Sequence, residues 1–345
     1  MASQLSLPDL TTPFHLPTAA STSHPMPRLA LGTFKVTGPT CRDAIVAALD
    51  AGIRHLDTAA IYKNHVEVAA ALRLAGLPRD DVFLTTKISP YDMGSDLTPR
   101  AIQNALAELQ TNYVDLLLLH WPGVARKKHT DPVHRARRRE AWVALEAAVR
   151  EGQARAIGVS NFTSAHLEEV CGYATVPVAV NQFECHPRWP QRELIDTCRR
   201  LGVVPQAYSP LGTGELLHHP RVRDLAAREK RKGGENQEGD HEKDQGLGTA
   251  ASLRSDPPVG GSRRPEVRDD GGRGPASGIH GTAAQVLLRW ILDQDMAVVV
   301  KSTQPDRIRE WTPAALASLT SPPSTSLATL ADDPHKYCWD PSTVL

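Results

Sequence analysis

Short apolar runs recur along the chain and alternate with segments of helical periodicity. The runs have the length of β-strands, and several are almost continuously apolar, as in DLLLLH (115–120), which is typical of parallel strands buried on both faces. Between them, apolar residues recur every three or four positions in stretches such as 40–52, 98–110 and 137–152, which predicts amphipathic helices. The eight expected strands are 29–33, 54–59, 82–87, 115–120, 155–161, 178–184, 203–209 and 297–302.

Eight strands that alternate with helices predict an α/β protein with a (β/α)8, or TIM, barrel. A doubly wound parallel sheet is the main alternative, but no GxGxxG pattern follows the first strand. Residues 14–33 are expected to hold a short hairpin that caps the barrel floor. We therefore expect one TIM-barrel catalytic domain over residues 1–345.

One long segment departs from this alternation. Residues 229–278 are rich in Gly, Pro and charged residues and nearly lack large apolar ones. Such a segment cannot bury enough surface to offset the entropy of ordering it, so we predict a disordered low-complexity insertion before the last helix, 281–294. A surface loop can carry an insertion of this kind at little cost in closure entropy.

The composition narrows the possible partners and location. Lys and Arg number 39 and so do Asp and Glu, and a net charge of zero argues against broad binding of nucleic acid or anionic membrane. The five cysteines are scattered without metal-like spacing, which fits a reducing cytoplasm and predicts no metal site. No apolar run is long enough to cross a membrane, and the first 27 residues lack a secretory signal pattern. They are rich in Ser, Thr and Pro and poor in acidic residues, so an organellar transit peptide is the alternative to a cytoplasmic location. No pattern indicates an oligomer, so a monomer is expected.

Four polar residues follow three successive strand-like runs. Asp57 and Tyr62 lie in GIRHLDTAAIYKN (52–64), Lys87 ends DVFLTTK, and His120 ends DLLLLH. In a barrel of parallel strands, the C-terminal strand ends meet at one mouth, where the chemistry takes place. Singly, each residue type more often serves packing, capping or solvation. Their joint placement predicts a proton-transfer site.

These residue types suit the reduction of a carbonyl group. The developing alkoxide needs a proton, and tyrosine is normally a weak acid with a pKa of about 10. We expect the ammonium of Lys87 to lower the pKa of Tyr62, and Asp57 to hold Lys87 charged and in place. We expect His120 to donate a hydrogen bond that orients the carbonyl oxygen.

Several motifs resemble those of the aldo-keto reductase family, of the prostaglandin F synthase and 2,5-diketo-gluconate reductase type. They occur in the family's order over about 27–228 and 281–310: GIRHLDTAAIYKN (52–64), GVSNF (158–162), NQFECHP (181–187), AYSPLGTG (207–214) and KSTQPDRI (301–308). The resemblance implies a TIM barrel and NADPH-dependent reduction of aldehydes or ketones to alcohols. It implies Tyr62 as the general acid, with Asp57, Lys87 and His120 completing a catalytic tetrad.

The resemblance also implies the residues that would hold NADPH. For the nicotinamide carboxamide they are Ser160, Asn161 and Gln182, and for stacking on the nicotinamide ring Tyr208. For the pyrophosphate they are Ser209, Leu211 and Gly212, and for the adenosine 2′-phosphate Lys301, Ser302 and Arg307. The last set also makes physical sense alone, because two cations and a hydroxyl suit a dianionic phosphate.

Aromatic residues after the first and fourth strands suggest the substrate pocket. Phe34 and Trp121 would flank His120 at the mouth and suit an apolar carbonyl compound. The chain also departs from the family, with His65 where Glu is frequent and with Trp311 after Glu310. Residues 311–326 stand where a packed final helical region is expected, so 311–345 is predicted to be an atypical C-terminal tail.

Two other functional hypotheses remain open from the sequence. A cofactor-binding regulatory or partner-binding subunit is one, because the same fold serves both purposes and the insertion could contact a partner. An unstable product of a damaged gene is the other, because of the altered segments.

Overall fold

The structure is a computed structural model and describes residues 12–17, 24–229, 281–317, 319 and 326–345 of the chain. The predicted insertion at 229–278 lies outside the described residues except for residue 229. That residue belongs to a helix that begins at residue 220, and the described chain resumes at residue 281. The segment between them therefore separates two helices of the outer ring.

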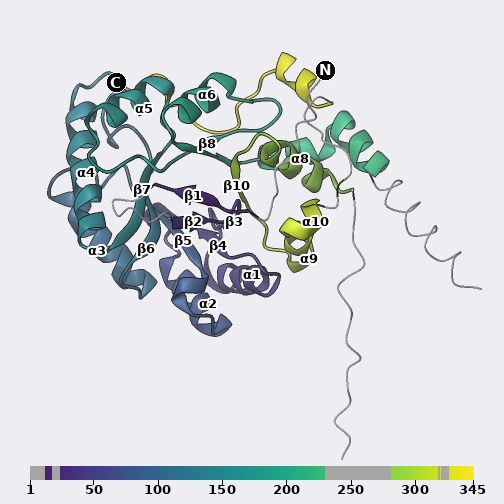
Figure 1. Cartoon of the computed structure of the whole chain (residues 1–345), viewed down its shortest axis with the longest axis horizontal. Coiled ribbons are helices and arrows are strands. Elements are labelled where there is room, and N and C mark those ends of the chain that lie inside the picture. The colour runs from purple at the N-terminus through teal and green to yellow at the C-terminus, as the bar shows by residue number, and fades with distance from the viewer. Residues whose placement is uncertain (1–11, 18–23, 230–280, 318, 320–325) are drawn as a thin grey trace, which may run out of the picture.

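Eight parallel strands close into a barrel in the order β10-β3-β4-β5-β6-β7-β8-β9 (Figure 1). This confirms the predicted (β/α)8 architecture, since strands that follow each other along the chain are neighbours in space. The strands are β3 (Leu29–Gly32), β4 (His55–Asp57), β5 (Phe83–Ile88), β6 (Val114–Leu119), β7 (Ala154–Ser160), β8 (Val180–Glu184), β9 (Val204–Tyr208) and β10 (Ala297–Val300).

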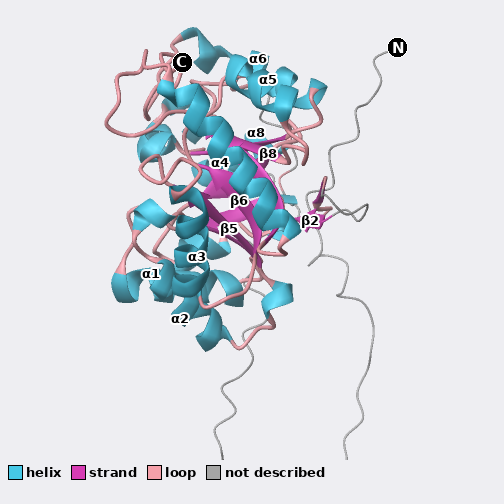
Figure 2. Cartoon of the chain, turned by 90° about the vertical axis from the view of Figure 1, so that its left-hand side faces the viewer, coloured by secondary structure: helices cyan, strands magenta, loops and turns pink. Residues whose placement is uncertain are grey.

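Helices surround the barrel, and Figure 2 shows α4 across the outer side of β6. The helix α8 begins with a capping box in which the Thr282 hydroxyl accepts from the Gln285 amide and the Gln285 side chain accepts from the Thr282 amide. The α-helices are α1 (Gly38–Asp50), α2 (His65–Ala75), α3 (Leu97–Leu109), α4 (Val133–Arg150), α5 (Ser164–Tyr173), α6 (Arg192–Arg200), α8 (Ala283–Leu292), α9 (Pro305–Arg309) and α10 (Pro313–Ala317). The 3-10 turns are η1 (Ala60–Tyr62), η2 (Arg79–Asp81), η3 (Gly212–His218) and η4 (Ala328–Asp332).

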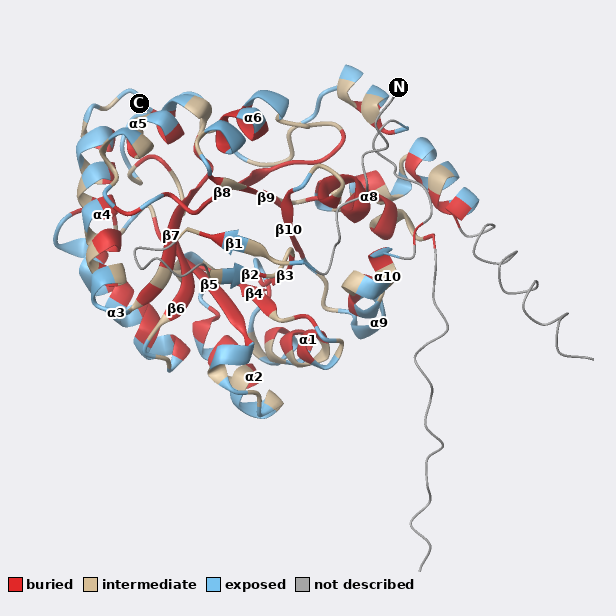
Figure 3. Ribbon diagram, in the orientation of Figure 1, coloured by how far each residue is buried: buried red, intermediate tan, exposed pale blue. Residues whose placement is uncertain are grey.

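The apolar run of β6 shows why these strands lack polar alternation. Leu116 and Leu118 point into the barrel interior, where they join Phe83 in an inner cluster. Leu117 and Leu119 belong to the larger cluster between the strands and the helices. Both faces of the strand are therefore buried, and Figure 3 shows buried residues along the strands of the barrel.

A hairpin closes one end of the barrel, as predicted. Its strands β1 (Phe14–Leu16) and β2 (His24–Met26) pair antiparallel. Leu16 and Met26 are fully buried and pack on the inner cluster. The N-terminal strand ends therefore meet a hydrophobic plug, which leaves the opposite end for polar side chains.

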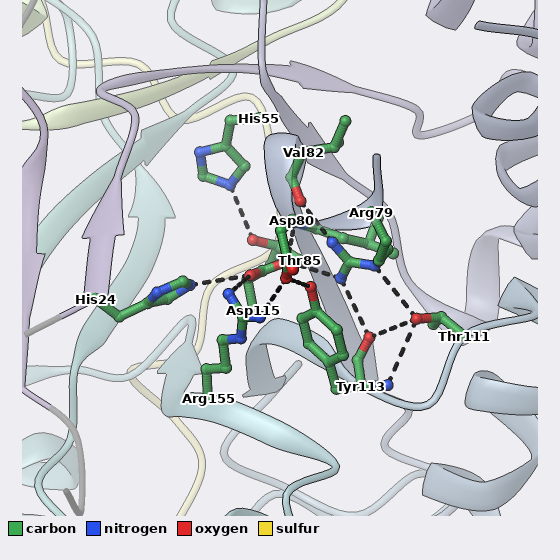
Figure 4. A network of polar contacts seen from close by, with 11 residues as sticks. His24, His55, Arg79, Asp80, Val82, Thr85, Thr111, Tyr113, Asp115 and Arg155 are labelled. Carbon is green, nitrogen blue, oxygen red and sulfur yellow. Dashed lines mark hydrogen bonds and ion pairs between the residues drawn. The ribbon is translucent and has the colours of Figure 1, made fainter. Parts of the chain in front are cut away.

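A network of polar contacts ties this hairpin to the barrel floor (Figure 4). At its centre, Asp115 accepts hydrogen bonds from His24 Nε2 at 2.9 Å, Arg79 Nη2 at 2.7 Å and the Leu84 amide at 2.8 Å. Burial alone would raise the pKa of Asp115, but the bonds from His24 and Arg79 outweigh it and the pKa is lowered. The floor therefore holds an ionised carboxylate with several donors.

The segment after Glu310 is packed where the structure describes it. Trp311 and Leu316 are buried in the larger cluster between the strands and the helices, which is the main core of the protein. The Leu316 carbonyl accepts a hydrogen bond from Arg289 of α8 at 3.1 Å. The helix α10 therefore provides part of a packed helical region in the stretch that the sequence predicted to be atypical. Residues 318 and 320–325 of this stretch lie outside the described residues.

Candidate active site

The four polar residues singled out in the sequence lie on or after three adjacent strands. Asp57 ends β4, Lys87 is the next-to-last residue of β5, and His120 follows β6. Tyr62 ends the 3-10 turn η1 in the loop after β4, and so does not itself end a strand. The structure brings all four together at the end of the barrel opposite the hairpin.

Asp57 and Lys87 form a buried ion pair at the centre of this group. Lys87 Nζ donates to Asp57 Oδ1 at 2.5 Å and to the Thr58 carbonyl at 3.0 Å. Their side chains are 3% and 0% exposed, so the pair lies outside solvent screening. Burial lowers the pKa of Lys87, and the attraction of Asp57 opposes this shift.

The hydroxyl of Tyr62 lies beside this pair, 3.5 Å from Lys87 Nζ. Burial and then the negative charge of Asp57 raise the pKa of Tyr62 well above its usual value. The expectation that Lys87 lowers this pKa is therefore wrong. The ammonium is closer to Asp57 than to Tyr62, so the carboxylate offsets its charge. Tyr62 is held as a neutral phenol, the form that can give a proton.

His120 lies on the other side of Tyr62. Their ring centroids are 5.6 Å apart and the rings are nearly perpendicular, at 74°. Burial and then the charge of Lys87 lower the pKa of His120 to about 3, so the imidazole is neutral near pH 7. Its buried Nδ1 has no hydrogen-bond partner within the described part of the chain. A polar atom of this kind is rare in protein interiors and marks a position where a ligand can bind.

A hydrogen-bonded layer joins the ion pair to strands β8 and β9. Gln182 Nε2 donates to Asp57 Oδ2 at 2.8 Å and to Gln206 Oε1 at 2.8 Å. Ser160 donates from its hydroxyl to the Gln182 carbonyl at 2.9 Å. Gln206 was not singled out in the sequence, although a glutamine inside the apolar run VVPQAYS was a usable signal.

Asn161 links the end of β7 to both His120 and Tyr208. Its Nδ2 donates to the His120 carbonyl at 2.9 Å, and its Oδ1 accepts from the Tyr208 hydroxyl at 2.7 Å. The residue has a left-handed backbone with φ of 63°, which is uncommon outside glycine and which Asn tolerates better than most residues. The Tyr208 ring is thereby fixed at the barrel mouth.

The three residues predicted for the pyrophosphate follow β9 in one loop. Ser209 and Gly212 both have positive φ, at 52° and 54°. A Cβ on Gly212 would lie 2.7 Å from Tyr337 Cε2 and 2.8 Å from Leu216, so only glycine fits. Leu211, between them, packs on the main core.

Lys301, Ser302 and Arg307 lie on β10's C-terminal connection and on α9. Lys301 and Arg307 are exposed, and neither forms an ion pair with any described residue. The Ser302 hydroxyl accepts from the Gln304 amide at 3.0 Å. Two exposed cations without a carboxylate partner leave charge available for an anionic group.

Aromatic side chains surround the mouth. Phe34 is 51% exposed and its ring centroid lies 5.0 Å from that of Tyr62. Trp121 contacts Trp339 edge to face, with centroids 6.1 Å apart. The contribution of Trp339 was missed, because its approach to the barrel depends on folding of the C-terminal segment rather than on a strand pattern.

Among the described residues, no cluster of His, Cys, Asp and Glu is arranged to hold a metal ion. None of the helices in the described ranges is long and apolar enough to span a bilayer.

Comparisons with known proteins agree with this geometry. The model of the aldo/keto reductase family matches residues 28–322. A glyoxal reductase from Bacillus subtilis is 41% identical over 202 residues, which cover 58% of this chain and 69% of that protein. An aldo-keto reductase from Mycolicibacterium smegmatis is 32% identical over 306 residues, covering 88% of this chain and 90% of its own length. The solved structure of the aldose reductase from Schistosoma japonicum superposes with a TM-score of 0.68 at 26% identity, covering 93% of this chain and 92% of that one.

Members of such a family reduce carbonyl groups with a nicotinamide cofactor, which fits a barrel mouth with a buried ion pair, a neutral phenol and a neutral imidazole. The chain therefore belongs to the aldo/keto reductase family of oxidoreductases.

Proposed function

We propose that this protein reduces aldehydes or ketones to alcohols with NADPH, and that Tyr62 supplies the proton. The observation that carries this proposal is the surroundings of the Tyr62 hydroxyl. It stays protonated in a half-buried site 3.5 Å from an ammonium and beside a neutral imidazole. A phenol in that setting suits general acid catalysis on a carbonyl oxygen that gains negative charge.

Each neighbour has a role at the reacting oxygen. The Lys87 ammonium lies 3.5 Å from the Tyr62 oxygen and can donate a hydrogen bond to it, while Asp57 keeps Lys87 charged and aimed. His120 donates a hydrogen bond from its neutral ring and orients the carbonyl group. The half-buried position of the His120 ring and the aromatic side chains near it limit the access of water to these donors.

The residues present fit a nicotinamide dinucleotide phosphate. When bound, NADPH supplies the hydride from C4 of its nicotinamide ring. Ser160, Asn161 and Gln182 lie together at the ends of β7 and β8 and would face the carboxamide, although the amide hydrogens of Gln182 are already donated to Asp57 and Gln206. Tyr208 would offer its ring face. Lys301 and Arg307 are exposed and form no ion pair with a carboxylate among the described residues, so they suit the 2′-phosphate and favour NADPH over NADH.

The barrel mouth suits a carbonyl compound with an apolar group. Phe34 and Trp121 offer ring surface beside His120, and the mouth holds no metal-like cluster among the described residues. One relative is named a glyoxal reductase, so glyoxal is a reasonable first substrate to test.

The decisive experiment follows the absorbance of NADPH with purified protein and a panel of aldehydes and ketones. We expect turnover that Tyr62→Phe lowers by about 10²–10⁴-fold, the usual contribution of a general acid. The variant should still bind NADPH, seen as a rise in its unfolding temperature with cofactor.

Tyr113→Phe is a matched control, because Tyr113 lies on the barrel floor and its hydroxyl contacts the exposed Asp80. It should leave turnover unchanged. Equal activity of Tyr62→Phe and wild type would refute the role of Tyr62. Absence of turnover together with retained NADPH binding would favour a regulatory subunit.

A further inference from the structure

A buried carboxylate holds the C-terminal segment over the barrel mouth. Glu184 ends β8 and is 2% exposed. Its Oε1 accepts from the Tyr337 amide at 2.7 Å, and its Oε2 accepts from the Cys338 amide at 3.0 Å. Each carboxylate oxygen therefore binds the amide of one of two consecutive residues. This geometry fits an ionised carboxylate.

The position of Glu184 places this contact next to the candidate active site. Gln182 lies two residues earlier, so both side chains are on the same side of β8. Gln182 contacts Asp57 inside the barrel, and Glu184 lies one layer nearer the mouth. The strand therefore connects the ion pair to the C-terminal segment.

Glu184 is ionised in this setting. Burial alone would raise its pKa, but hydrogen bonds from His186 and from the Tyr337 amide outweigh burial and lower it. His186 Nε2 lies 3.1 Å from Oε1. The carboxylate therefore keeps its charge and both of its amide donors near neutral pH.

The held segment packs on the loop proposed for the pyrophosphate. The Tyr337 ring occupies the space where a Cβ on Gly212 would lie, at 2.7 Å. Cys338 Sγ is 3.6 Å from the Ser209 hydroxyl. The position of residues 337 and 338 therefore determines which side chains cover the loop that contains Ser209 and Gly212.

Trp339 follows directly. It is 79% exposed, yet its ring meets Trp121 edge to face at 6.1 Å. An exposed tryptophan has little burial to hold it, so its place depends on how the adjoining chain is held. The two peptide groups before it donate to Glu184, and Lys336 and Asp340 on either side of it form an ion pair at 3.6 Å.

We propose that Glu184 is a positioning residue that sets Trp339 as one wall of the substrate site, so that large apolar carbonyl compounds bind better than small ones. This inference rests on the proposed function. Glu184 acts only through the segment 337–339 and does not touch the reacting atoms.

The rest of the C-terminal segment has anchors of its own. The Val344 carbonyl lies 2.8 Å from His166 Nε2, and the Leu345 amide donates to the His129 carbonyl at 3.0 Å. On the other side, the His335 amide donates to the Arg188 carbonyl at 3.1 Å. The C-terminus accordingly lies beside α5 (Figure 1). Loss of the Glu184 bonds should therefore loosen the backbone of residues 337–339 and shift Trp339, while the flanking residues and the Tyr337 ring contacts stay in place.

The test compares Glu184→Gln with a matched control, Glu146→Gln. Glutamine keeps the shape of Glu184 but removes the charge and points an amide donor at a backbone donor. Glu146 is also a buried carboxylate with two backbone donors, from Thr175 at 2.6 Å and Val176 at 3.0 Å, but it lies on α4, away from the mouth. Both variants should lower the unfolding temperature.

Only Glu184→Gln should change substrate preference. We expect its KM for 2-naphthaldehyde to rise about tenfold, the effect of losing a buried charge-assisted bond, while its KM for glyoxal changes by less than about twofold. Its kcat should stay close to that of the wild type. Glu146→Gln should leave both KM values unchanged.

A third variant keeps the proposal testable if Glu184→Gln folds poorly. Trp339→Ala removes an exposed ring and should raise the KM for 2-naphthaldehyde to a similar extent. If Glu184 acts through Trp339, the double variant should add little to either single change. Full additivity, or equal KM changes for both substrates, would overturn the inference. A wild type that reduces neither aldehyde would instead refute the proposed function.

Discussion

The ammonium nitrogen of Lys87 lies 2.5 Å from Oδ1 of Asp57, with 3% or less of either side chain exposed. Taking two charges out of water is costly, and each is stable there only because the other is present. The pair is therefore one unit, and Gln182 extends it to β8. Changes to either partner test that unit directly.

Replacing Asp57 with Asn should destabilise the fold strongly. It leaves the Lys87 ammonium buried without a counter-charge, which typically costs about 3–5 kcal/mol in the free energy of unfolding. Urea unfolding at neutral pH would measure the loss. The double variant Asp57→Asn with Lys87→Met should be more stable than Asp57→Asn alone. Simple addition of the two single effects would contradict a coupled pair.

The pH dependence of reduction should not contain an ionisation of His120. Its pKa is lowered to about 3, so the ring is neutral both at pH 5 and at pH 8 and donates the same hydrogen bond throughout. We therefore expect the profile of kcat/KM against pH across this range to have the same shape in the wild type and in His120→Gln. An inflection near the ordinary histidine pKa of about 6.5 that His120→Gln removes would show that the ring is more solvated than the structure indicates.

Replacing both Lys301 and Arg307 with Ala should weaken NADPH far more than NADH. Each removes a charge-assisted contact to the 2′-phosphate, so the KM for NADPH should rise by about tenfold or more. Steady-state kinetics with the two cofactors would measure the change. Arg309→Ala is the matched control on α9, since Arg309 is paired with Asp306 at 2.8 Å. An equal loss for NADPH and NADH would contradict a phosphate contact.

The barrel wall should not tolerate a methyl group at Gly158. A Cβ there would lie 2.4 Å from the Val180 carbonyl oxygen, so β7 and β8 must separate. Gly158→Ala should cost about 1–3 kcal/mol of stability by overpacking. Gly172→Ala in α5 meets nothing within 4 Å and should be neutral or stabilising, because alanine favours helix over glycine. Calorimetry of the two variants would settle the comparison, and equal unfolding temperatures would contradict it.

The strand pattern was readable because both faces of the barrel wall are buried. The DLLLLH run predicts β6, since its leucines face the interior and the helices by turns. The hairpin over the floor was also predicted, and Leu16 and Met26 confirm it. His24 on that hairpin was not, because its partner Asp115 lies 91 positions away.

The local order of residues also placed Asp57, Lys87 and His120 at one mouth, because parallel strands all point their C-terminal ends the same way. The protonation state of Tyr62 could not be predicted from the local order of residues. The direction of its pKa shift depends on burial and on which group is nearer to Lys87, and both are set by packing.

The sequence by itself determined the barrel, the family and the residues to examine, because these follow from apolar periodicity and from motifs that lie close together along the chain. Only the tertiary structure decided that Glu184 binds the amides of Tyr337 and Cys338. Any residue can offer a backbone amide, so no side-chain pattern marks that contact. Its existence depends on where two segments 153 positions apart come to rest.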